Sequence, residues 1–472
     1  MDTATFALVG GVILVAALLS GLVERSRFPQ VALFLLLGLA IGPFGFGLVD
    51  FRLDSAILET ISVLALVLVL FTDAVAIDVG EVRRHRTLVR LVLGPGTLVT
   101  AALIAVAAWA LLGLAPGPAA ILGAALASTD PVMMRGLLRG GTVPADARNV
   151  LSLESGLNDL VLLPIVLAAM AVLSGGGGGG HWGRAALDLF VVGPGAGIAV
   201  GFIGVTVLER ARRWVGVRRD YESLYALGIA FTAYAAAEAA HGSGFLAAFA
   251  AGLTVAAADA ELCDCFLDFG QAAAEMFLLL TFVAFGSSLI WTGLAGLTWR
   301  GVAFAVLALG VRSAVLAVAL IGRGLDPRSR RLIVWFGPRG LSTLLLVLLP
   351  VFAGLPGADR LFAPAALVVL LSVVIHGGAL MFTRERRAGS GIGPSLDPTP
   401  PARSPERITL GELRDLQARG ERVVLLDVRK DRAWNESNEK ALGAIRLPPG
   451  GAAPRAAELA LPRHDWLVAY CA

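Results

Sequence analysis

The chain contains thirteen apolar segments, each long enough to enter or cross a lipid bilayer as a helix. A helix needs about 20 residues to span the hydrocarbon core, and fewer when it is broken or buried among neighbouring helices. With 57% hydrophobic and 16% charged residues, the chain also lacks the charges that a soluble globular surface requires. We therefore predict an all-α polytopic membrane protein. Its expected spans lie near residues 5–22, 31–47, 57–77, 91–113, 117–136, 154–173, 186–208, 223–240, 244–258, 272–294, 299–322, 331–353 and 364–382.

Arginines are distributed unequally between alternate loops. One set of loops carries about 21 arginines, whereas the intervening set carries Arg52, Arg184, Arg300 and Arg360. Cytoplasmic loops are enriched in arginine and lysine, so the alternation predicts an outside N-terminus and a cytoplasmic C-terminal tail in the inner (plasma) membrane. The acidic stretch 256–270 is the one expected inner loop without arginine. The net charge of +3 reflects these loops and does not indicate nucleic-acid binding.

Gly-Pro-Gly occurs twice inside expected spans, in "LGPGTL" (93–98) and "VGPGAG" (192–197). We expect both motifs to break their helices, because proline removes a backbone donor and glycine is a poor helix former. Broken segments that recur in the two halves of a chain are typical of internally repeated transporters.

An aspartate interrupts the apolar run "LASTDPVMMR" (126–135). An ionised carboxylate at the centre of a span costs at least ~2.5 to 3.5 kcal/mol, so Asp130 is a candidate functional group. Pro131 disfavours helical geometry at the preceding residue, and the helix should therefore open near Thr129 and Asp130. An opened helix frees backbone carbonyls, which together with a carboxylate are suitable ligands for an alkali cation.

The next span carries a second group of polar residues, in "SLESGLNDLVLLPIVL" (152–167). Ser155 and Asp159 are four residues apart and share one helix face, which we expect to face the opened helix. Glu154 and Asn158 share the neighbouring face and are suited to bind a buried guanidinium.

Two arginines lie within apolar segments and could provide that guanidinium. Arg339 is our preferred partner for Glu154 and Asn158, and Arg312 is the second candidate. Asp73 ends the apolar run of the third span, where it either faces the same cavity or caps the helix at the membrane interface.

Five motifs together resemble the monovalent cation/proton antiporters, specifically bacterial sodium/proton antiporters with an Asn-Asp pair. They are "ASTDP", "ESGLNDLVLLP", "HGSGFLAAFAAGL", "GPRGLSTLLLVLL" and "LLSVVIHG", in this order within residues 5–382. The resemblance implies thirteen helices in two inverted repeats, a homodimer held by a scaffold domain, and a mobile core domain that carries the ion by an elevator-like movement. It implies no cofactor, only the transported cation and proton.

The resemblance also implies roles for individual residues. Asp159 is the expected ion and proton carrier, and Asp130 and Ser155 complete the coordination of a monovalent cation, with Thr129 contributing through its backbone. Glu154 and Asn158 are expected to pair with Arg339. Many relatives have a glutamate in "LFEGG" at the end of the third span, whereas this chain has "LFTDA" with Asp73 one position later, so we name Asp73 only as a possible extra ligand.

The expected function is exchange of sodium for a proton, which would regulate cytoplasmic pH and cation content. A potassium/proton antiporter is the main alternative, followed by an ion channel and by a membrane-anchored sulfurtransferase. Titratable carboxylates facing a broken helix favour exchange over conduction, because one site that binds either ion couples the two. Position 158 is an asparagine and no lysine precedes Lys430, so we expect a single proton carrier and electroneutral exchange.

The composition changes after Arg387. Residues 388–405 form a Gly/Pro/Ser-rich linker, and residues 406–472 resemble a rhodanese-like α/β domain through "LLDVR", "GAIRLPP" and a final strand that delivers Cys471. In rhodaneses a loop and a helix follow the cysteine. Here one residue follows Cys471, so we expect this domain to be partial and inactive in sulfur transfer.

Overall fold

The computed structural model describes most of the chain. The described residues are 29–77, 86–130, 143–174, 182–258, 260–295, 297–378, 418–429, 440–448 and 466–470, with single positions and pairs elsewhere. Contacts divide the chain into two compact units, Met1–Ser390 and Gly391–Ala472. The first unit is helical, and seven of its described helices are long and apolar enough to cross a membrane, while four shorter apolar helices accompany them. The expected first span lies almost entirely outside the described residues.

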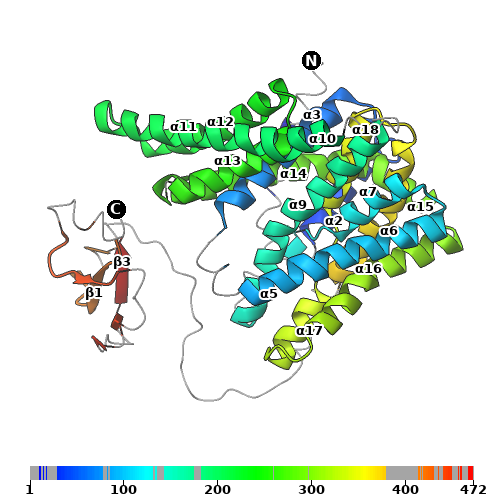
Figure 1. Cartoon of the computed structure of the whole chain (residues 1–472). Helices are drawn as coiled ribbons and strands as arrows, with labels where there is room; N and C mark the ends of the chain where they lie inside the picture. Colours follow the sequence, from blue (N-terminus) through cyan, green and yellow to red (C-terminus); the bar gives the residue numbers. More distant parts are fainter. Residues whose placement is uncertain are drawn as a thin grey trace. The chain divides into compact units, whose positions relative to one another are not determined.

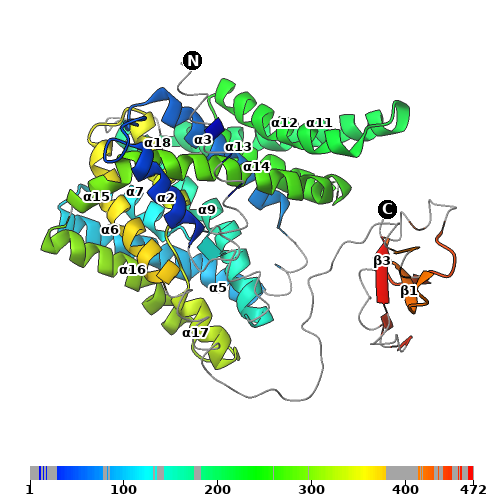
Figure 2. The same ribbon diagram turned by 180° about the vertical axis from the view of Figure 1, so that it is seen from behind.

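Every later span coincides with a described helix or pair of helices, and these form two groups of neighbours (Figures 1 and 2). The first group packs through small residues: a side chain at Gly38 would meet the backbone of Gly286, and one at Gly197 would meet that of Ala247. Its members are α2 (Gln30–Ile41), α3 (Ala56–Val75), α11 (Gly193–Trp214), α12 (Arg219–Ala239), α13 (Gly244–Ala258) and α14 (Ala260–Ser287).

The second group contains the residues singled out in the sequence. Its members are α5 (Arg86–Leu91), α6 (Leu98–Leu112), α7 (Pro116–Ala127), α9 (Ala145–Ser174), α16 (Trp299–Ala319), α17 (Pro327–Trp335), α18 (Leu341–Phe352) and α19 (Phe362–Ser372). Short elements connect the longer ones: α10 (Trp182–Leu187), η3 (Leu289–Trp291), α15 (Thr292–Ala295) and η4 (Ala358–Leu361).

The two Gly-Pro-Gly motifs do not break their helices, which corrects the expectation from the sequence. The first lies in the π-helical segment η1 (Val92–Thr97), which joins α5 to α6. The second begins α11 directly after the π-helical segment η2 (Asp188–Val192). A wider π turn accommodates the missing N–H of proline without ending the helix. A third π segment, η5 (Val373–Gly377), continues α19.

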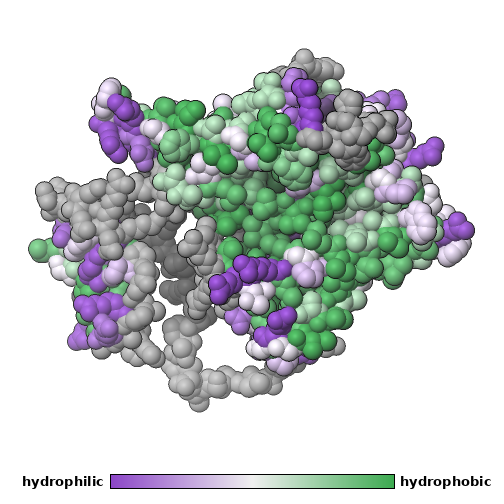
Figure 3. Space-filling view, viewed as in Figure 1, coloured by the Kyte–Doolittle hydropathy of each residue, from purple (hydrophilic) through white to green (hydrophobic). Residues whose placement is uncertain are grey.

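The face of the helical unit shown in Figure 3 is largely apolar along the helices, and hydrophilic residues gather at helix ends. Its interior nevertheless contains charged side chains, namely Asp130, Glu154, Asp159, Arg312 and Arg339, which are all almost completely buried. The fold is therefore an apolar membrane bundle built around a polar centre.

The second unit contains a small parallel sheet in the order β2-β1-β3, formed by β1 (Val423–Asp427), β2 (Ile445–Arg446) and β3 (Trp466–Tyr470). The final strand expected from the sequence is present as β3. The carboxyl ends of parallel strands lie at one edge, and there Arg429 and Tyr470 both bind the carboxylate of Asp427. Cys471 lies outside the described residues.

Candidate functional site

Two helices of the second group are interrupted and cross at their interruptions. The first interruption follows α7, where Ser128 adopts an extended conformation and Pro131 comes shortly after, as the sequence predicts. The second separates α17 from α18 at residues 336–340, which contain Gly337 and Pro338. The Asp130 N–H donates to the carbonyl of Pro338 at 2.9 Å, so the two extended segments are joined directly.

Each interrupted segment satisfies the helix end of the other. Arg339 Nη1 donates to the carbonyls of Ala127 and Ser128, at 2.6 and 2.8 Å, where α7 ends. Asp130 Oδ2 accepts the N–H of Leu341 at 2.8 Å, where α18 begins. Helix ends leave backbone groups unpaired, and a cation at the carbonyl end and an anion at the N–H end are both favourable.

Gly340 is required for this crossing. A Cβ atom at position 340 would collide with the Oδ2 and Cγ atoms of Asp130. The carboxylate therefore approaches the backbone of the second segment as closely as a glycine allows.

The α9 helix brings Asp159 to the crossing. Ser128 Oγ donates to Asp159 Oδ1 at 2.7 Å. Asp130 is close enough for the two carboxylates to repel one another. Two acids thus meet where α7 ends and α18 begins, surrounded by hydroxyl and carbonyl oxygens.

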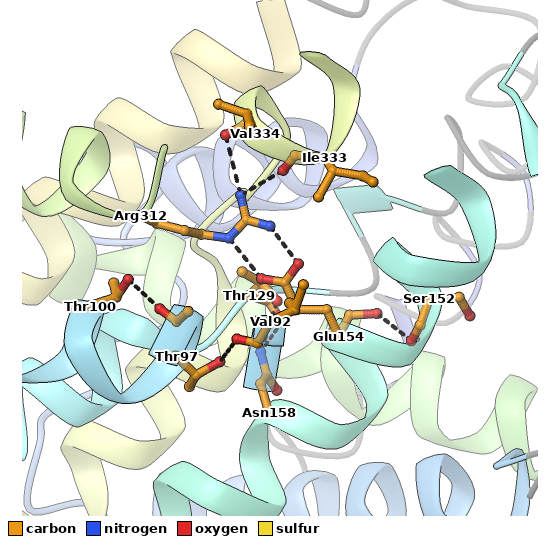
Figure 4. Close-up of polar contacts among 12 residues, drawn as sticks. Val92, Thr97, Thr100, Thr129, Ser152, Glu154, Asn158, Arg312, Ile333 and Val334 are labelled. Atoms are coloured by element: carbon orange, nitrogen blue, oxygen red, sulfur yellow. Dashed lines mark hydrogen bonds and ion pairs between the residues drawn. The ribbon is translucent and has the colours of Figure 1, made fainter. Parts of the chain in front are cut away.

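Asn158 binds the interrupted segment and not an arginine. Its Nδ2 donates to the hydroxyl of Thr129 at 2.8 Å and to the Thr129 carbonyl at 3.3 Å (Figure 4). Its Oδ1 is buried without a hydrogen-bond partner. The Ser155 hydroxyl donates to the carbonyl of Ser152 at 3.1 Å, within its own helix.

The arginine that pairs with Glu154 is Arg312, so the expected Glu154–Arg339 pair is wrong. Arg312 Nε lies 2.7 Å from Oε1 of Glu154, and Nη2 lies 2.5 Å from Oε2 (Figure 4). Arg312 Nη1 also donates to the Ile333 carbonyl near the end of α17 at 3.1 Å. This position stabilises the Arg312 guanidinium, because it binds a carboxylate and the carbonyl end of a helix at the same time. Arg339 instead binds the carbonyls at the end of α7.

Two further residues contact the site, Ser372 and His376, to which the sequence assigned no specific role. Ser372 Oγ accepts the backbone N–H of Arg339 at 2.7 Å and lies 3.1 Å from Nδ1 of His376. The His376 ring contacts the rings of Trp335 and Phe336. The only signal in the sequence was the motif "LLSVVIHG", since a serine or histidine in an apolar helix is otherwise an ordinary packing contact.

Asp73 lies in the last turn of α3 and is partly buried. Its role as an extra ligand stays a prediction. Among the described residues, no group of three or more His, Cys, Asp or Glu side chains is placed to hold a metal ion. The site contains two carboxyl groups together with hydroxyl and carbonyl oxygens, which suit a proton or a hard monovalent cation.

Comparisons with known proteins identify the family and the fold of the chain. The family model described as "Sodium/hydrogen exchanger, transmembrane" matches residues 12–385. The K⁺/H⁺ antiporter NhaP2 of Shewanella sp. (strain MR-4) is 28% identical over 413 residues, which cover 85% of this chain and 69% of that protein. The K⁺/H⁺ antiporter NhaP of Alkalimonas amylolytica is 26% identical, over 80% of this chain and 65% of that protein.

A solved structure has a similar fold. The sodium proton antiporter MjNhaP1 from Methanocaldococcus jannaschii matches with a TM-score of 0.65 and 20% identity, over 79% of this chain and 98% of that chain.

Proposed function

The chain belongs to the sodium/hydrogen exchanger family, and from this premise we propose that a single carboxylate, Asp159, carries the two exchanged ions in turn. The chain is a cation/proton antiporter and not an enzyme. The observation that carries the proposal is the position of Asp159, which is buried, bound by Ser128 and adjacent to Asp130 where two interrupted helices cross. A cation bound there meets carboxylate, hydroxyl and carbonyl oxygens.

The charges of the site support one-for-one exchange. Three buried carboxylates, Asp130, Glu154 and Asp159, face two buried guanidinium groups, Arg312 and Arg339. With all five ionised, the cluster carries one net negative charge, which one proton or one monovalent cation neutralises. An uncompensated charge in the bilayer interior is costly, so the site crosses the membrane in either neutral form and not empty. Competition for one carboxylate then couples the two fluxes.

Sodium is the cation that we propose, with potassium as the alternative. The solved structure with the similar fold is titled a sodium proton antiporter, whereas the two relatives named above are K⁺/H⁺ antiporters. The test is cation-dependent dequenching of a pH-sensitive dye in everted membrane vesicles, with sodium, potassium and lithium in turn. We expect a response to sodium that Asp159→Asn abolishes at normal expression. Retained exchange in this variant would remove the carrier role.

The resemblance to the antiporter family and the arginine distribution also support a proposal for the assembly and its orientation. We assign to the chain a homodimer, thirteen spans in the inner membrane, an outside N-terminus and a cytoplasmic tail. The coordination of the cation by Asp130, Asp159 and Ser155, with Thr129 through its backbone, is part of the proposal. The rhodanese-like assignment of residues 406–472, with linker 388–405, is supported by the parallel sheet alone. Deletion of residues 404–472 should leave exchange largely intact, since the Gly/Pro/Ser-rich composition of residues 388–405 is typical of a linker.

A further inference from the structure

The hairpin between α11 and α12 combines exposed arginines with exposed aromatic rings. Residues 209–222, "ERARRWVGVRRDYE", hold five arginines and three acids. The Arg210 guanidinium lies over the Trp214 ring at 5.1 Å, and the Arg218 guanidinium lies over the Tyr221 ring at 5.7 Å. Tryptophan and tyrosine concentrate at the level of lipid headgroups, so this hairpin marks a membrane interface.

The end of α11 is held in one conformation. Arg212 forms a bidentate ion pair with Glu222, with Nε and Nη2 at 2.7 and 2.8 Å from the two carboxylate oxygens. The N–H groups of Val215 and Gly216 both donate to the carbonyl of Ala211, and Gly216 has a φ of 77°, which favours glycine. The two helix ends are therefore fixed, and the remaining side chains of the hairpin project from a rigid support.

Arg210 and Arg213 lie on the exposed face of α11. They continue a stripe of exposed apolar residues on the same face, which includes Phe202, Ile203 and Val207. Arg210 is two turns beyond Phe202, a rise of about 12 Å. Figure 3 shows the same transition, from apolar surface along the helices to hydrophilic residues at the hairpin tip.

We propose that this surface binds an anionic phospholipid, with the phosphate group at Arg210 and Arg213, Trp214 beside the headgroup, and an acyl chain along the apolar stripe. Arginine binds phosphate through parallel N–H donors, and stacking on Trp214 holds Arg210 in place. Glu209 lies 3.7 Å from Arg213, but the Arg213 side chain is largely exposed and that of Glu209 about half exposed, and such a surface pair contributes little in water. The proposal does not depend on the role of Asp159.

The chain provides a matched control. Arg300 lies over the Trp299 ring at 5.4 Å at the start of α16, and it is the one arginine of residues 296–303. It has the same stacked geometry on an exposed ring but no second arginine one turn away.

The test is native mass spectrometry of the full-length protein, delipidated in neutral detergent and titrated with phosphatidylglycerol or with phosphatidylcholine of the same chains. Each arginine near an anionic surface contributes about fivefold to binding, so R210Q/R213Q should bind phosphatidylglycerol roughly 30-fold more weakly. R300Q should bind as the wild type does. Phosphatidylcholine should bind weakly and equally to all three, and glycerol phosphate should not compete.

Several outcomes would overturn the proposal. Unchanged phosphatidylglycerol binding in R210Q/R213Q is one, and competition by glycerol phosphate, which indicates a site for free phosphate, is another. Dissociation of a dimer by the double substitution, equal in both lipids, would make the surface an interface between two copies of the chain. Equal melting temperatures of wild type and variant without lipid are required before any of these comparisons.

Discussion

Glu154 and Arg312 form a buried bidentate ion pair that joins α9 to α16, with atom separations of 2.7 and 2.5 Å. Through Nη1, Arg312 also binds the carbonyl of Ile333, so one side chain holds three helices together. Arg339 lies nearby but donates to α7. The two arginines therefore stabilise different parts of the site, and their variants should behave differently.

Arg312→Ala should destabilise the protein by about 3 to 5 kcal/mol, because it leaves the Glu154 carboxylate buried and unpaired. The measurement is thermal unfolding in detergent. Glu154→Gln in the same protein should relieve part of the loss, since it removes the orphaned charge. In a double-mutant cycle we expect coupling of Glu154 to Arg312 that is clearly larger than its coupling to Arg339. Equal coupling to both would contradict the geometry.

Ser128→Ala should raise the apparent KM for the cation by about tenfold or more, because a hydrogen bond to a charged carboxylate contributes about 1.5 to 3 kcal/mol. The Ser128 hydroxyl binds Asp159, whereas that of Ser155 binds the Ser152 carbonyl, so Ser155→Ala should have the smaller effect. Asp130→Asn should nearly abolish exchange, because Asp130 is both near the cation and bound to α18. Cation titrations in everted vesicles separate these variants, and a larger effect of Ser155→Ala would reverse the assignment.

Gly340→Ala should abolish exchange and lower the melting temperature, since the new methyl group collides with the Asp130 carboxylate and separates the interrupted helices. Gly310→Ala is the control, because a side chain there meets nothing within 4 Å and lies in the helix α16. Alanine is favoured over glycine inside a helix by up to about 1 kcal/mol, so this variant should be active and at least as stable as the wild type.

Exchange should be insensitive to membrane voltage. One proton replaces one cation in a cluster of three carboxylates and two guanidinium groups, and no net charge moves. Each net charge would otherwise couple at ~2.3 kcal/mol per 100 mV. The measurement uses proteoliposomes with a fixed pH gradient and a voltage set by potassium and valinomycin, with sodium as the exchanged ion. A sodium gradient that shifts with voltage would require a second proton carrier, such as Asp130 or Asp73.

The sheet of the tail should lose stability in acid. The bound Arg429 side chain holds the pKa of Asp427 far below its ordinary value of 3.8. A carboxylate with a lowered pKa in the folded state stabilises the fold above its unfolded pKa, and this contribution disappears as the pH falls below about 4. Digestion of the full-length protein with pepsin, which is active in acid, should show increasing cleavage of the tail below this pH. Asp427→Asn should already be cleaved faster near pH 5, with a flatter pH dependence.

Local chemistry explains which features of the fold were predictable. The apolar segments predict the membrane spans because a span must exclude most charged residues. Pro131 predicts the end of α7 because proline restricts the backbone of the residue before it. The prediction that the Gly-Pro-Gly motifs break their helices was wrong, because a π turn can accommodate a proline without ending the helix. The local sequence does not distinguish a break from a π turn, which depends on packing. The second interruption contains Gly337 and Pro338, where the sequence predicted one continuous span over residues 331–353.

The sequence predicted which residues form the polar centre, but it did not predict which arginine pairs with Glu154. The 3.6-residue repeat places Asp159 and Ser155 on one face of α9 and Glu154 and Asn158 on the next. Which arginine meets Glu154 depends on the crossing of α9 with α16, and no local pattern encodes that crossing. Ser372 was missed because a buried serine in an apolar helix usually binds its own backbone, whereas this one binds Arg339.

The reciprocal capping of α7 and α18 has a consequence for the order of biogenesis. Arg339 is 212 residues from Ala127 and 211 residues from Ser128, whose carbonyls it binds at the end of α7. Asp130 is likewise 211 residues from Leu341, whose N–H it binds at the start of α18. At a synthesis rate of about 5 to 20 residues per second, the delay between the synthesis of α7 and that of Arg339 is roughly 10 to 40 seconds. During that time the end of α7 and Asp130 rely on water, lipid headgroups or the insertion machinery. The ion site therefore matures only after the second half of the bundle has entered the bilayer, and a nascent chain that stops before residue 339 lacks both the guanidinium that binds the end of α7 and the Leu341 N–H that binds the Asp130 carboxylate.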